Sequence, residues 1–221
     1  MALTLDSAPS TRQLANFLTN LTYSFTYGGG SGAIYVACLV TTGFAINTVT
    51  WSGQSFSRLI THTSPSDNDV EIWQLLNPSG SGAANIVITP VSGSPSYILA
   101  TTLSLLGSIG SGGATNTSTS ATNTISVADG SWVVIAGASD TVDVAASTNV
   151  TSTVSANPVI GLYGPKSGAG NISLSYTNGS PYSIAVEVID NAAGGGGSTV
   201  PITVISPNQA TAFSSALVRR A

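Results

Sequence analysis

The chain contains one stretch of sequence twice, and this repeat constrains the fold more than any other feature. Residues 81–95 (SGAANIVITPVSGSP) return as residues 167–181 (SGAGNISLSYTNGSP), with eight identical positions in the same register. Each copy predicts a strand, a Gly-Ser-Pro turn and a second strand, over residues 97–106 in the first copy and 182–189 in the second. We therefore expect a β-hairpin, present twice, inside a larger meander.

Apolar periodicity predicts further strands on both sides of each repeat. Alternation over residues 21–27 predicts a half-buried strand whose apolar face holds Leu21, Tyr23, Phe25 and Tyr27. Residues 33–42 are apolar without alternation, which predicts a strand buried on both faces or central in its sheet, and residues 131–136 resemble them and predict a second central apolar strand. Residues 48–51 and 56–63 predict a hairpin around Ser52-Gly53, with a bulge in its second arm.

Together these elements predict an all-β fold. We expect a two-sheet antiparallel β-sandwich, jelly-roll-like, with an internal half-repeat and about ten to twelve strands. The sandwich would span residues 21–191, with half-repeats of about 21–106 and 125–191 separated by the polar, Gly-rich connection 107–124. Residues 1–20 predict an N-terminal arm or a short capped helix.

Residues 192–221 predict a Gly-rich tether followed by a C-terminal strand and tail. A tethered strand is not stable alone. It would either fold back as an edge strand of its own sandwich or add to a neighbouring subunit by β-augmentation. The candidate protein-interaction residues are Thr199, Val200, Ile202, Val204, Phe213, Leu217 and Val218.

The charge pattern argues against several classes of partner. Charged residues make up 6% of the chain, against about 25% in an ordinary domain. Residues 20–192 hold only Arg58 and Lys166 against eight carboxylates, which disfavours nucleic-acid binding. We expect no membrane-spanning helix, since no apolar run reaches about 18 residues, and no Sec-type signal peptide at the N-terminus.

The residue inventory also disfavours catalysis, and we expect neither a catalytic residue nor a cofactor. His62 is the only histidine and has no nucleophile elbow nearby, while Cys38 lies in an apolar run and is expected to be a buried, inert thiol. One histidine and one cysteine cannot form a zinc site. Glu71 and Glu187 lie within strands, where we expect them to face solvent rather than act as a glycosidase pair.

Two weaker binding signals have structural alternatives. Asp67 and Asp69 could offer oxygen ligands to Ca²⁺, but an Asx-type turn before a strand is the favoured interpretation. Trp51, Trp73 and Trp132 could stack on a sugar, but each lies in or beside an apolar strand, so core packing is favoured.

A family resemblance rests on EIWQLLNP at residues 71–78, the following SGSGAANIVITPVSGSPSYILATTLSLLG, and the upstream TVTWSGQSFSRL. This order of strand, turn, strand, W-x-L-x-N-P and hairpin resembles the β-sandwich modules of phage structural proteins and of large bacterial surface or secreted proteins. The resemblance covers about residues 21–191. It implies a stable exposed module and transfers no catalytic or ligand residue.

The resulting expectation is a non-enzymatic virion structural protein, in particular a decoration (cement) protein that binds and stabilises a phage capsid. Its partners would be the major capsid protein or another virion protein, and a homo-oligomer, with a trimer favoured, is expected. It would be made in the host cytoplasm and located in the virion. One alternative is an extracellular carbohydrate-binding or adhesive module exported by a non-Sec route. Another is a capsid shell protein.

Overall fold

The computed structural model describes residues 3–190 apart from 8–9, 11–12, 17–19, 42, 64–67, 92–94, 111–112, 121, 139–144, 149–151, 154–158 and 178–181. These described residues form eighteen β-strands in four sheets and no helix. All the strand pairs are antiparallel. The predicted all-β, antiparallel sandwich class is confirmed.

The four sheets make two sandwiches, each with a large inner sheet and a smaller outer sheet. The inner sheet of the first sandwich has the order β1 (Thr4–Ser7), β10 (Tyr97–Leu106), β4 (Gly32–Val40), β8 (Asp69–Leu76), β7 (Ser57–His62), with β2 (Gln13–Asn16) also on β10. Its outer sheet has the order β3 (Leu21–Tyr27), β9 (Gly82–Pro90), β5 (Ile46–Trp51), β6 (Gln54–Ser55).

In the second sandwich the inner order is β11 (Thr115–Ser118), β18 (Tyr182–Val188), β13 (Trp132–Ala138), β16 (Val159–Tyr163), β15 (Ser152–Thr153). Its outer order is β12 (Thr122–Val127), β17 (Gly170–Thr177), β14 (Ala145–Thr148).

The two sandwiches share one topology. The inner order β1-β10-β4-β8-β7 matches β11-β18-β13-β16-β15 strand for strand, and the outer order β3-β9-β5 matches β12-β17-β14. In the first sandwich β1 pairs with β10, the first strand with the last, and β3 pairs with β9, the next to last, which is the winding of a jelly roll. The internal half-repeat is therefore a repeat of a whole sandwich, so the chain has four layers where one two-sheet sandwich was expected.

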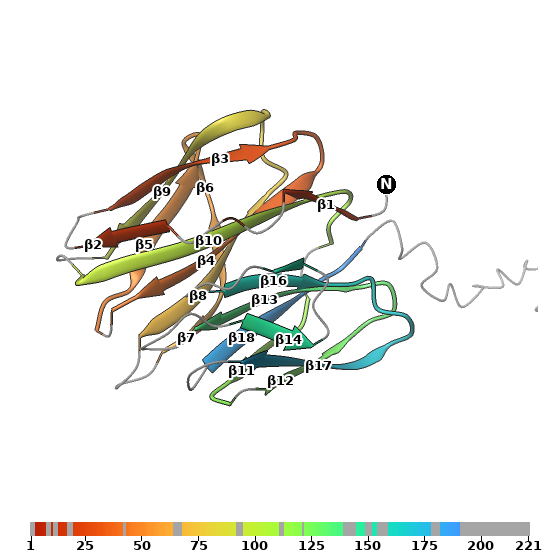
Figure 1. Cartoon of the computed structure of the whole chain (residues 1–221). Coiled ribbons are helices and arrows are strands. Elements are labelled where there is room, and N and C mark those ends of the chain that lie inside the picture. The colour runs from red at the N-terminus through yellow and green to blue at the C-terminus, as the bar shows by residue number, and fades with distance from the viewer. Residues whose placement is uncertain are drawn as a thin grey trace, which may run out of the picture.

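The two inner sheets face each other across the largest core (Figure 1). Residues of β10 lie near β16, and residues of β18 lie near β7 and β8, with β4 and β13 near the middle. Because β10 corresponds to β18 and β8 to β16, each sandwich presents the same face to the other, as in a two-fold interface. The order of layers is outer, inner, inner, outer.

This layering explains the apolar strands that do not alternate. Every residue from Ala33 to Val40 on β4 is fully buried. Tyr35 and Leu39 point into the core between the sandwiches, whereas Val36 and Cys38 point into the core of the first sandwich. Both β4 and β13 are inner strands of their sheets and are buried throughout, so the predictions for these two apolar strands are confirmed.

The predicted repeat hairpins are wrong. β9 pairs with β3 and β5, whereas β10 pairs with β1, β2 and β4, so the chain crosses from the outer to the inner sheet between them. The second copy, β17 and β18, crosses in the same way. A turn sequence signals that the chain reverses, but it does not specify whether the two strands share a sheet.

Three further expectations differ from the structure. Of the two interpretations of residues 1–20, an arm or a short helix, the helix is wrong, because β1 and β2 are strands paired with β10. The connection 107–124 is not only a linker, since it contains β11 and the start of β12. At the turn Ser52-Gly53, β5 forms a hairpin with the two-residue strand β6. The expected second arm, β7, does not pair with β5 but joins the inner sheet.

Other local predictions are confirmed. On β3 buried and exposed residues alternate as expected, with Thr22, Ser24 and Thr26 exposed. The bulge in the second arm lies between Arg58 and Ile60 on β7.

Candidate functional site

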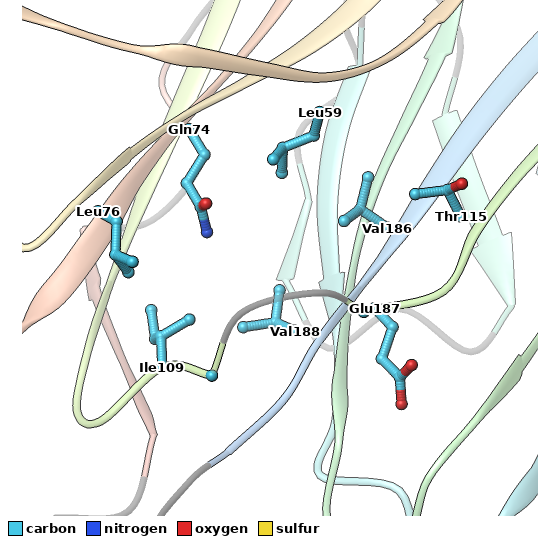
Figure 2. Close-up of a pocket in the computed structure, with 10 residues that line it drawn as sticks. Leu59, Gln74, Leu76, Ile109, Thr115, Val186, Glu187 and Val188 are labelled. Carbon is cyan, nitrogen blue, oxygen red and sulfur yellow. The ribbon is translucent and has the colours of Figure 1, made fainter.

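A groove of about 340 Å³ lies at one edge of the contact between the two sandwiches (Figure 2). Its lining is mostly aliphatic and comes from β7, β8, β18 and the connection between the sandwiches. The aliphatic lining residues are Leu59, Leu76, Ile109, Val186 and Val188. Figure 2 shows these side chains around a common space, whereas the Glu187 carboxylate points away from it.

One polar side chain is held at the groove by a specific contact. The Gln74 amide donates a hydrogen bond of 2.8 Å from Nε2 to the Tyr35 hydroxyl. Tyr35 is fully buried on β4, and burial raises the pKa of its phenol. The phenol stays neutral, so the groove is an apolar surface with one fixed amide.

On the opposite face of β8, Glu71 is buried, and the expectation that it faces solvent is wrong. Its side chain is 1% exposed, and its carboxylate accepts hydrogen bonds from Trp73 Nε1 at 2.6 Å and from the Ile46 amide at 3.4 Å. Arg58 Nη1 lies 3.4 Å from the same carboxylate, and the guanidinium carbon lies 5.8 Å from the centre of the Trp73 ring. The bulge on β7 follows Arg58 directly.

Opposing effects set the charge of Glu71. Burial raises the pKa of this carboxyl above its ordinary value and is the largest effect, although the Trp73 hydrogen bond and the Arg58 charge work against it. The carboxylate joins β5 of the outer sheet to β7 and β8 of the inner sheet. These contacts hold the two sheets of the first sandwich together.

Glu187 of the second sandwich is also buried, against expectation, and it accepts hydrogen bonds from the connections that flank β11 and β12. It is 9% exposed and accepts hydrogen bonds from the amides of Ala114 at 2.9 Å and Ala128 at 2.7 Å. Burial is the largest effect and would raise the pKa of this carboxyl, but hydrogen bonding, first from the Ala114 and Ala128 amides, outweighs it in sum, and the pKa lies below its ordinary value. In the first sandwich, Asp6 does the same for the turn after β3, with its Oδ2 accepting from the Gly28 amide at 2.9 Å.

The aromatic residues considered for sugar binding lie in the cores. Trp51, Trp73 and Trp132 are 1%, 6% and 8% exposed, which confirms core packing. The large apolar residues that are exposed in the described part of the chain are all aliphatic, namely Leu5, Leu14, Leu76 and Val91.

The structure places only one of the two candidate Ca²⁺ ligands. Asp69 is buried on β8, and Asp67 lies outside the described residues. Among the described residues, no three His, Cys, Asp or Glu side chains lie close enough together to hold a metal ion. Cys38 is buried, as expected, and burial raises the pKa of its thiol well above the ordinary value. His62 ends β7, with its ring centre 5.3 Å from that of Tyr182.

The predicted interaction residues between Thr199 and Val218, together with the whole segment 191–221, lie outside the described residues. Sequence reasoning did not identify the groove. One signal was present, because Ile109 is the only large apolar residue in the connection 107–124.

The fold defines the class of this protein, which is a pair of jelly-roll sandwiches in one chain. No protein-family model, curated protein or solved structure matches the chain. Among the described residues, no helix is long and apolar enough to cross a membrane.

Proposed function

We propose that this protein is a non-enzymatic structural component of a virion, specifically a decoration protein that binds the outside of a phage capsid. Its partner in this proposal is the major capsid protein or another virion protein.

The observation that carries the proposal is the character of the two outer sheets. The exposed positions of β3 are Thr22, Ser24 and Thr26, and those of β12 are Thr122, Thr124 and Ser126. Both rows are neutral and rich in hydroxyl groups. Burying a charge without a partner is costly, whereas hydroxyl groups can exchange water for hydrogen bonds across an interface. Such faces suit packing against a neighbour in a particle.

The inner sheets support the same proposal. They bury their apolar faces against each other in one shared core, which leaves the polar outer faces available to partners. A protein that must keep its shape on the surface of a particle benefits from a core that spans both sandwiches.

The proposal is tested by fractionating particles from the source that makes the protein. After density-gradient centrifugation, the protein should sediment with intact capsids. It should be removable by mild denaturant, and the purified protein should bind again to stripped particles.

Two matched variants identify the face that binds. Thr22→Lys with Thr26→Lys places two charges on the first outer sheet, and Thr122→Lys with Thr124→Lys does so on the second. One pair should abolish rebinding while the other leaves it intact. The proposal would be abandoned if the wild-type protein stayed at the top of the gradient, or if both variant pairs bound like the wild type.

A further inference from the structure

The groove between the sandwiches is an apolar surface that the described residues leave partly open. Leu76 is 38% exposed and Leu59 is half-buried, while Val188 is almost fully buried at the same site. An aliphatic side chain left in water gives up the hydrophobic stabilisation that its burial would provide. A covering segment would therefore be stabilised there.

The chain itself leaves from the rim of this groove. Val188 lines the groove, and two residues later Asp190 forms a bridge with Ile109, which also lines it. Residues 191–221 follow from this point. The first eight, 191–198, include four consecutive glycines.

The segment after these glycines has the pattern that such a groove requires. In an extended conformation, residues 199–205 (TVPITVI) would place Val200, Ile202 and Val204 on one face. Pro201 excludes a central strand and is accepted at an edge.

The linker length favours docking within one chain. A flexible Gly-rich linker of eight residues has a root-mean-square span of about 16 Å. Its end therefore stays near the groove beside Asp190, and a short flexible linker gives an effective concentration on the order of millimolar. A segment from a second molecule would have to compete with this concentration.

We propose that residues 199–205 of the same chain occupy the groove between the sandwiches, with Val200, Ile202 and Val204 packed against the open surface that Leu59 and Leu76 form. The segment covers the open side of the central core and joins both sandwiches at one end. This inference is independent of which particle, if any, the protein binds.

Paired cysteines test the proposal in the full chain. Leu76→Cys with Ile202→Cys should form a disulfide within one molecule under mild oxidation, visible as a faster-migrating monomer on a non-reducing gel. The matched control is Val91→Cys with Ile202→Cys. Val91 is exposed, follows the C-terminal end of β9, and does not line the groove. The native Cys38 is fully buried and does not compete.

The groove pair should close about tenfold faster than the control pair or more, because docking raises the local concentration of the tail. Equal rates would mean an undocked tail, and disulfide-linked dimers as the main product would mean docking onto a second copy. Either result overturns the proposal.

Hydrogen exchange gives a second test that needs no new cysteine. Val200→Asp, Ile202→Asp and Val204→Asp together should cause loss of amide protection around Leu59 and Leu76. The control changes Phe213, Leu217 and Val218 to Asp and should leave that protection unchanged. Equal protection in the two variants would contradict the proposed docking.

Discussion

The amide of Leu3 donates a hydrogen bond of 3.0 Å to the carboxylate of Asp190, so the two ends of the described chain are joined. Both residues are buried, and Leu3 belongs to the core between the sandwiches. The N-terminal segment of the first sandwich is thereby fixed to the last described residue of the second.

Replacing Asp190 should destabilise the protein measurably. A buried hydrogen bond to a charged group contributes about 1.5–3 kcal/mol, so Asp190→Ala is expected to lower the free energy of unfolding by about that amount. Urea unfolding measures the change. The control is Asp129→Ala, which removes an exposed hydrogen bond of 2.6 Å to the Gly168 amide and should cost less. A smaller loss for Asp190→Ala than for Asp129→Ala would contradict the importance of this contact.

The two buried glutamates should give opposite pH dependences. The pKa of Glu71 is raised above 4.5 in the folded protein, so its contribution to stability is fully present below that pH and is lost as the pH rises through the folded pKa. The pKa of Glu187 is lowered, so its contribution is present above 4.5 and is lost as the pH falls through the folded pKa.

Unfolding of the wild type, Glu71→Gln and Glu187→Gln between about pH 3 and pH 7 tests this. The stability of the wild type relative to Glu71→Gln should fall as the pH rises above 4.5. Relative to Glu187→Gln, it should fall as the pH drops below 4.5. Two difference curves with the same sign of slope would refute the assignment of at least one carboxyl.

A glycine in the connection between the sandwiches is required by close backbone contact. A Cβ atom at Gly113 would collide with the carbonyl oxygen of Glu187. We expect Gly113→Ala to destabilise the protein by about 1–3 kcal/mol, as overpacking usually does. Thr115→Ala, at an exposed position on the same edge, should change stability by about 0.5 kcal/mol or less. Thermal unfolding of both variants measures the difference, and equal melting temperatures would show that the connection can shift.

The all-β class and many strands could be predicted from sequence because periodicity records the faces that each strand buries. The alternation on β3 and its absence on β4 were both interpretable, and the absence on β4 reflects the contact between two inner sheets. The pairing of β9 with β3 was not predictable from the Gly-Ser-Pro turn, although β9 alternates and β10 does not, which is a sign of different layers.

The buried carboxylates could not be predicted for a different reason. Glu71 accepts a hydrogen bond from Trp73 on its own strand, but its other partners and those of Glu187 lie farther away in sequence, such as the Arg58 side chain and the Ala128 amide. A strand pattern gives the face on which a residue lies, but it does not show which hydrogen-bond donors of other segments lie next to that face. The groove was missed likewise, because it exists only once the two sandwiches have packed.

The shared core predicts that the two sandwiches unfold together. Leu103 on β10 and Leu162 on β16 are fully buried in the same central core, one from each inner sheet. Leu103→Ala and Leu162→Ala should each cost about 2–5 kcal/mol, and each should lower the midpoint of one common transition. Differential scanning calorimetry distinguishes this from independent unfolding, in which two transitions would separate and each variant would shift only one. The control is Leu174→Ala on β17, which lies in the core of the second sandwich alone and should still shift the same single transition. Two resolved transitions would mean that the contact between the inner sheets is too weak to couple the sandwiches.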